Sequence, residues 1–100
     1  MVVSQRETAA TMKHNKTTYD AAERITTFHF ENGRTMRLWN DTTQQWFLNG
    51  EPHREDGPAV IWADGTKSWY LNGKRHREDG PAIILAGGLE LWYLNGELQQ

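Results

Sequence analysis

Short apolar runs alternate with polar turn residues over most of the chain, from residue 25 onward. Residues 25–30 are rich in β-branched and aromatic side chains, Glu31-Asn32-Gly33 favours a tight turn, and residues 34–39 form the returning run. Later apolar runs follow at residues 43–48, 59–62, 67–71, 82–85 and 89–94. Asn-Gly and Asp-Gly dipeptides between such runs are the strongest short-range signal for β-hairpins. The pattern therefore predicts an all-β fold, an antiparallel meander of hairpins.

The chain also contains an internal repeat with a fixed period of 23 residues. Residues 46–59 return as residues 69–82 with eleven of 14 positions identical, and a third copy begins at Trp92. A short fixed period is typical of stacked supersecondary units. The expected repeat domain, residues 25–100, comprises a degenerate unit (25–45), two full units (46–68 and 69–91) and a partial unit (92–100).

Residues 1–24 lack the strand-like pattern and are expected to form a separate N-terminal segment. Residues 1–17 are polar without apolar periodicity, which favours a flexible tail. Thr17 or Thr18 is a suitable N-cap, and Asp20 and Glu23 suit the first turns of a helix. The sequence thus predicts a short helix over residues 18–24.

The turn at Asp64-Gly65 decides which side chains share a face. A two-residue turn there would place Val60 opposite Trp69. Alternation then sends all five tryptophans to one face, which we expect to be the main core. The second face carries smaller apolar side chains and a row formed by Phe47, Tyr70 and Tyr93. Two interpretations of this second face stay open: the N-terminal segment or sheet curvature covers it, or it is exposed and binds a partner.

Composition narrows the classes of function. One hundred residues make one small domain, and a net charge of −2 without a basic stripe argues against a general nucleic-acid binder. The absence of cysteine excludes disulfides and thiolate metal sites, and no apolar run approaches the length of a membrane span. Residues 1–13 lack the apolar stretch of a signal peptide. We therefore expect a cytoplasmic protein, in the host cytoplasm if a phage encodes it.

The 23-residue unit resembles the MORN repeats, and in particular the variant MORN-type repeats of bacterial, phage and large-virus proteins. The residues that carry the resemblance are Tyr70, Asn72, Gly73, His76, Gly80 and Gly88, with their partners Phe47, Asn49, Gly50, His53, Gly57 and Gly65. The loop departs from the family, because it reads His-Arg-Glu-Asp-Gly-Pro where the usual unit favours His-Gly-x-Gly. Over residues 35–100, the resemblance implies a β-hairpin solenoid that contacts proteins or lipids and has no catalytic residues.

Each full copy contains a His-Arg pair, His53-Arg54 and His76-Arg77. Two imidazoles with two arginines could cleave a phosphodiester by acid–base chemistry or hold an anionic ligand. Acidic residues follow each pair at once, however, and would satisfy the arginines. We favour a structural loop in which the glycine supplies a positive φ and the arginine braces the neighbouring unit. No known ligand spacing relates His29 to these pairs, so neither a metal nor a cofactor is expected.

These observations predict a non-catalytic protein that binds a partner macromolecule, expected to be a protein, and inhibits or sequesters it. The resemblance implies an antitoxin or a phage inhibitor of host defence. The expected binding residues are Phe47, Tyr70, Tyr93, His53, Arg54, His76 and Arg77. The alternatives are a sponge for an anionic nucleotide and a histidine-based nuclease. Because residues 89–94 would leave an unpaired edge, a homodimer through the C-terminal edge or the second apolar face is a further prediction.

Overall fold

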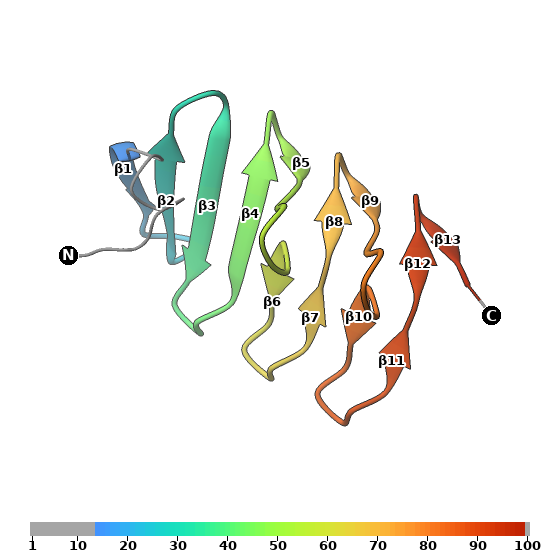
Figure 1. Cartoon of the computed structure of the whole chain (residues 1–100). Helices are drawn as coiled ribbons and strands as arrows, with labels where there is room; N and C mark the ends of the chain where they lie inside the picture. The colour runs from blue at the N-terminus through green and yellow to red at the C-terminus, as the bar shows by residue number, and fades with distance from the viewer. Residues whose placement is uncertain (1–13, 100) are drawn as a thin grey trace.

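The computed structural model describes residues 14–99 as a succession of antiparallel strands (Figure 1). The strands are β1 (His14–Asp20), β2 (Ile25–Phe30), β3 (Arg34–Trp39), β4 (Gln44–Leu48), β5 (Glu51–Pro52), β6 (Val60–Ile61), β7 (Lys67–Ser68), β8 (Tyr70–Leu71), β9 (Lys74–Arg75), β10 (Ile83–Ile84), β11 (Glu90–Leu91), β12 (Tyr93–Leu94) and β13 (Glu97–Leu98). The predicted all-β antiparallel meander is confirmed.

The strands follow one another across the sheet in chain order. The main sheet has the order β1-β2-β3-β4-β6-β7-β10-β11, with β5 paired to β4, while β8–β9 and β12–β13 form two-stranded sheets. Backbone hydrogen bonds join these short hairpins to their neighbours, since the amide of Arg54 donates to the carbonyl of Tyr70 and the amide of Gly73 donates to Pro52. No helix that could cross a membrane occurs in the part of the chain that the structure describes.

The predicted helix over residues 18–24 is wrong. Strand β1 runs through Asp20 and pairs with β2. A turn follows, in which the Asp20 carbonyl accepts a 2.7 Å hydrogen bond from the amide of Arg24. The Asp20 side chain accepts from the amide of Glu23 at 3.1 Å. Pairing with a neighbouring strand thus overrides a weak helical propensity. Residues 14–17 also belong to β1 and not to a tail, and the rest of the expected tail, residues 1–13, lies outside the described residues.

The Asn-Gly dipeptides form the tight turns that their sequence predicts. The pairs Asn49-Gly50, Asn72-Gly73 and Asn95-Gly96 join β4 to β5, β8 to β9 and β12 to β13, and every one of these six residues has φ between +50° and +86°. Two consecutive positive φ angles define the type I′ turn, whose twist matches that of the flanking strands. Asparagine and glycine adopt this conformation at the lowest cost.

The turn between β6 and β7 differs from the predicted one by a single residue. The amide of Trp62 donates to the carbonyl of Thr66 at 2.9 Å, so three residues form the turn. Only Gly65 has a positive φ (95°), while the Asp64 side chain accepts a 2.9 Å hydrogen bond from the Thr66 amide. Val60 therefore pairs with Ser68 and not with Trp69. A one-residue change of register moves the following residues to the opposite face.

The five tryptophans therefore do not share one face, and that prediction is wrong. Trp46 and Phe47 are consecutive in β4 and point to opposite sides of the sheet. We call the side of Trp46 the loop face. The strand pairing shows that Trp69 and Trp92 lie on this same face. The side of Phe47, here called the tyrosine face, carries Tyr70, Tyr93, Trp39 and Trp62.

The buried apolar core is small and recurs along the chain. Its members are Ala59, Val60, Ala82 and Ile83, which occupy two pairs of positions 23 residues apart. Ser68 is also buried and pairs with both Val60 and Ile83. The tryptophans at the middle of the sheet, Trp46 and Trp69, are only half-buried. A single layer of strands cannot enclose more apolar surface, so both faces remain in part exposed.

Candidate functional site

The histidines of the repeated loops connect one sequence copy to the next. His53 is buried, and its Nδ1 accepts a 2.9 Å hydrogen bond from the backbone amide of Asn72. Its Nε2 lies 3.1 Å from a carboxylate oxygen of Glu55. Since Nδ1 accepts, Nε2 carries the proton and donates to Glu55. The second copy repeats both contacts. His76 accepts a 2.9 Å hydrogen bond from the amide of Asn95, and its Nε2 lies 3.2 Å from Glu78.

The loop arginines lie on tryptophan rings of the same copy. The guanidinium of Arg54 is 3.9 Å from the centroid of the Trp46 ring. Its Nε donates to Asp56 at 3.0 Å, and its Nη1 donates to the carbonyl of Pro58 at 3.1 Å. Arg77 of the second copy makes the same three contacts, with the ring of Trp69 (4.1 Å), the carboxylate of Asp79 (3.1 Å) and the carbonyl of Pro81 (3.0 Å). Arginine thus braces its own unit, not the neighbouring unit as predicted.

The glycine of each loop makes room for this arginine. Neither Gly57 nor Gly80 has a positive φ, which corrects the predicted reason for glycine at these positions. A Cβ atom at Gly57 would lie 3.1 Å from Cζ of Arg54, and one at Gly80 would lie 2.6 Å from Cζ of Arg77. The guanidinium therefore lies between an aromatic ring and a glycine backbone, where a larger residue would displace it.

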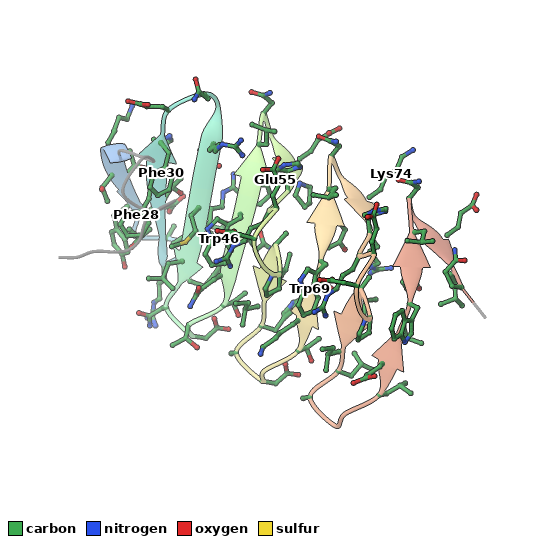
Figure 2. All side chains as sticks on the ribbon, viewed as in Figure 1. Phe28, Phe30, Trp46, Glu55, Trp69 and Lys74 are labelled. Atoms are coloured by element: carbon green, nitrogen blue, oxygen red, sulfur yellow. The ribbon has the colours of Figure 1, made fainter. Side chains whose placement is uncertain are left out.

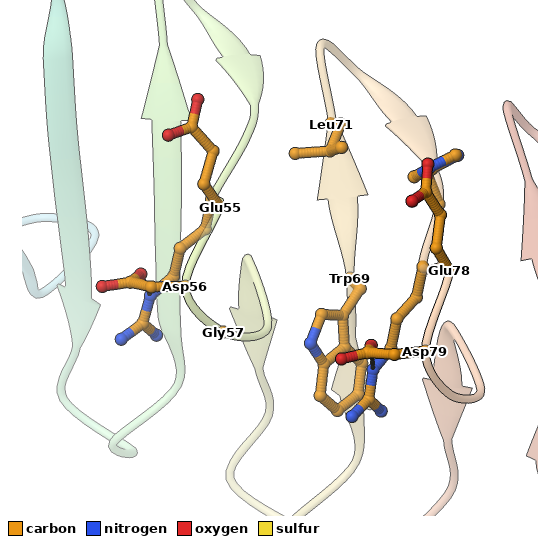
Figure 3. Close-up of a pocket in the computed structure, with 10 residues that line it drawn as sticks. Glu55, Asp56, Gly57, Trp69, Leu71, Glu78 and Asp79 are labelled. Atoms are coloured by element: carbon orange, nitrogen blue, oxygen red, sulfur yellow. Dashed lines mark hydrogen bonds and ion pairs between the residues drawn. The ribbon is translucent and has the colours of Figure 1, made fainter.

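A groove of about 670 Å³ lies between the two loops on the loop face (Figure 3). Its lining comprises one loop on each side and two strand residues between them: Arg54, Glu55, Asp56, Gly57, His76, Arg77, Glu78 and Asp79, with Trp69 and Leu71. The four carboxylates all pair with a histidine or arginine of their own loop. Among residues 14–99, no three histidine or carboxylate side chains converge to hold a metal ion.

The tyrosine face presents the predicted aromatic row. Arg37 lies 5.1 Å from the ring centroid of Phe47, and Arg75 lies 5.8 Å from that of Tyr70 and 5.4 Å from that of Tyr93. All three aromatic side chains are half-buried. The structure therefore separates the predicted binding residues. The aromatic row lies on one face, and the His-Arg loops lie on the other, where their arginines contact Trp46 and Trp69.

Within residues 14–99, four large apolar side chains of the tyrosine face are exposed. Leu98, which pairs with Tyr93, is 49% exposed at the C-terminal hairpin, and the other three lie beside the β6–β7 and β10–β11 turns. Trp62, Leu85 and Leu89 are 37%, 38% and 59% exposed. Trp62 pairs with Thr66, and Leu85 pairs with Leu89, through backbone hydrogen bonds of 2.9 Å. The sequence pattern placed Trp62 in the core, although its position beside the turn residues Asp64-Gly65 was a signal of exposure. We call Trp62, Leu85 and Leu89 the apolar row.

The C-terminal edge is shorter than predicted. Strand β12 pairs with β13, and the amide of Gln99 donates to the carbonyl of Trp92 at 2.7 Å. Within the described residues, β11 keeps one side without a partner strand at the C-terminal end of the main sheet, as β1 does at the other end. The homodimer predicted from this edge stays a prediction.

No protein-family model, curated protein or solved structure matches this chain. Its function is therefore inferred from the chemistry of the two faces.

Proposed function

We propose that this chain is a non-catalytic binding protein that docks a partner protein on its tyrosine face and thereby inhibits or sequesters it. The observation that carries the proposal is the apolar row, in which Leu85 and Leu89 are directly paired and Trp62 lies on the same face with Thr66 between it and Leu85. A cluster of exposed apolar side chains on a small protein is a mark of an interaction surface. Tryptophan is also enriched among the residues that dominate binding energy.

The contacts of the repeated loops support the non-catalytic part of the proposal. Both ring nitrogens of His53 are engaged, one by a backbone amide and one by Glu55. A general base needs a nitrogen that can reach the proton of a substrate. Arg54 and Arg77 are each paired with an aspartate, so they are poor recognition sites for a nucleotide phosphate. These pairings disfavour both the nucleotide sponge and the nuclease.

We also propose that the hairpins form a MORN-type stack, as the sequence resemblance implies. Contacts that recur 23 residues apart support this assignment, among them the hydrogen bonds that the amides of Asn72 and Asn95 donate to His53 and His76. A stack of ordered hairpins would present the apolar row on a rigid support, which lowers the entropic cost of binding. An antitoxin or a phage inhibitor acting in the host cytoplasm is the role that we assign to such a surface.

Exposed side chains provide a sharp test that leaves the core intact. Leu89→Arg places a charge in the apolar row, whereas Tyr19→Arg makes the same change at the other end of the sheet, where Tyr19 is 62% exposed. Tagged wild type and both variants would be captured from the native host and their bound proteins identified by mass spectrometry. We expect a specific partner that is retained by Tyr19→Arg and lost by Leu89→Arg. Equal retention by the two variants would overturn the proposal.

A further inference from the structure

Ionised side chains are distributed unequally between the two faces. Every carboxylate at a strand position from β2 to β13 lies on the loop face, namely Glu51, Glu90 and Glu97. The four carboxylates of the repeated loops border the groove on that same face. On the tyrosine face, the charged strand residues from β2 to β13 are Arg37 and Arg75. Strand β1 adds one cation and one carboxylate to this face, Lys16 and Asp20, so its strand residues remain net basic although the chain is slightly acidic overall.

Arg75 lacks the counter-charge that the loop arginines have. Its guanidinium lies between the rings of Tyr70 and Tyr93, and it forms no ion pair with a carboxylate of the described residues. Its Nε is buried and has no hydrogen-bond partner. Leaving a buried donor without an acceptor costs about 1–3 kcal/mol, and more for a charged group. Because this Nε is closed to solvent while the residue is only half-buried, a ligand would contact the terminal nitrogens of the guanidinium.

The differences between the sequence copies point to the same place. Of the 14 aligned positions, three differ, because Phe47, Glu51 and Pro52 are replaced by Tyr70, Lys74 and Arg75. All three replacements line one cavity of about 340 Å³, together with Gly73 and Gly96. Figure 2 places Lys74 at the hairpin end of this region. Residues common to both copies maintain the unit, whereas these three make the second copy different.

We propose that this cavity receives a carboxylate from an acidic segment of the partner protein, with Arg75 as the recognising residue. Lys74 pairs with Leu71 and so has a loop-face strand position, but it also lines this cavity at the hairpin end and adds a second positive charge there. This inference rests on the proposed function, since it names the chemistry of the partner that docks on the tyrosine face. Contacts with two tyrosine rings hold the guanidinium in place, and a planar guanidinium matches a carboxylate through paired hydrogen bonds.

The charge count favours a protein carboxylate over nucleic acid. Arg37, Lys74 and Arg75 supply few cations, whereas proteins that bind nucleic acid neutralise a series of phosphates along the backbone. Glu51 lies beside the cavity, because its carboxyl carbon is 3.3 Å from the place a Cβ of Gly73 would occupy. It forms no ion pair with Lys74. Glu51 would repel an incoming carboxylate, so Glu51→Gln should strengthen binding.

Poly-glutamate is a suitable probe for the acidic segment, with oligo(dT) as the nucleic-acid comparison. Binding would be titrated by calorimetry for the wild type, Arg75→Gln and the matched control Lys67→Gln, which removes one charge from the loop face. We expect Arg75→Gln to weaken poly-glutamate binding about tenfold, as loss of a charge-assisted hydrogen bond predicts, and Lys67→Gln to leave it unchanged. Equal weakening by both variants, or equal binding of oligo(dT), would overturn the inference.

A double variant distinguishes loss of poly-glutamate binding from loss of the fold. Lys74→Glu with Arg75→Pro installs the residues of the first copy, which the equivalent hairpin β4–β5 already accommodates. It should remain folded and lose poly-glutamate binding. Capture of the native partner separates the two proposals. If Leu89→Arg abolishes capture while the double variant retains it, the docking face stands and the carboxylate site is wrong.

Discussion

The imidazole of His53 joins two sequence copies by accepting a hydrogen bond from the backbone amide of Asn72, which begins the turn of the next copy. The bond measures 2.9 Å and is partly buried, whereas the equivalent bond from Asn95 to His76 is exposed. Since water can replace an exposed acceptor, the two histidines should differ in their contribution to stability even though their sequence surroundings are the same.

His53→Ala should therefore destabilise the protein by about 1–3 kcal/mol, because it leaves the amide of Asn72 without an acceptor. His76→Ala should cost less. Urea unfolding followed by circular dichroism measures both free energies. A larger loss for His76→Ala would show that burial of this bond is not what determines its value.

The glycines of the loops offer a second matched comparison. Gly80→Ala would drive Arg77 away from the ring of Trp69, and we expect a loss of about 1–2 kcal/mol from the cation–π contact and its hydrogen bonds. Gly57→Ala should cost less, because the Cβ is 3.1 Å from the guanidinium carbon and not 2.6 Å. Gly87→Ala is the control.

Gly87 has no heavy atom within 4 Å of its virtual Cβ and no positive φ. There the substitution should be neutral or stabilise by about 0.4–1 kcal/mol through the unfolded chain. Thermal unfolding of the three variants would test the order. Similar losses at all three glycines would mean that space for the arginine is not the reason for glycine in the loops.

The tryptophans should contribute to stability according to their place on the sheet. Trp69 is half-buried beneath Arg77, whereas Trp62 is exposed at a turn. Trp69→Ala should cost about 3 kcal/mol, a large fraction of the stability of so small a domain, and Trp62→Ala should cost clearly less. The midpoint of guanidinium unfolding provides the comparison. The opposite order would invalidate the placement of the two rings.

A pH dependence follows from the turns. A hydrogen bond from the Thr66 backbone amide, and a second from its hydroxyl, lower the pKa of the exposed Asp64 carboxyl below its ordinary value of 3.8. Thr43 lowers the pKa of Asp41 in the same way. Because the folded-state pKa is the lower one, the stabilisation is present above pH 3.8 and is lost as the pH falls through the folded-state pKa.

Asp64→Asn keeps an acceptor in the turn but removes its charge. The variant should be less stable than the wild type at neutral pH, and the difference should vanish in acid, where the wild-type carboxyl is protonated. Urea unfolding at a series of pH values measures it. A difference that grows in acid would contradict this sign.

The sequence correctly predicted the turns that contain two residues, but it did not predict the length of the three-residue turn. Asn49-Gly50 determines its hairpin alone, since both residues adopt positive φ. At Asp64-Gly65 only the glycine does so, and the side chain of Asp64 stabilises a longer turn. That one additional residue exchanged the faces of Trp62 and Trp69 relative to each other, an outcome that composition and alternation cannot reveal.

The candidate site was less accessible to prediction for a similar reason. The residues common to both copies were predicted as possible catalytic or ligand-binding groups. His53 and Arg54, however, form hydrogen bonds within the fold. The unpaired Arg75 lies at a position where the copies differ, and its missing counter-charge depends on contacts that only three-dimensional packing defines.

The order of the strands also has a mechanical consequence. Within residues 14–99, each strand from β1 to β11 pairs only with strands near it in the chain. A force applied between residues 14 and 99 would act across the strands and would break the hydrogen bonds of one hairpin before loading the next. The protein should therefore extend in successive steps at low tension, as a series of weak links, and shorten again by re-forming neighbouring hairpins.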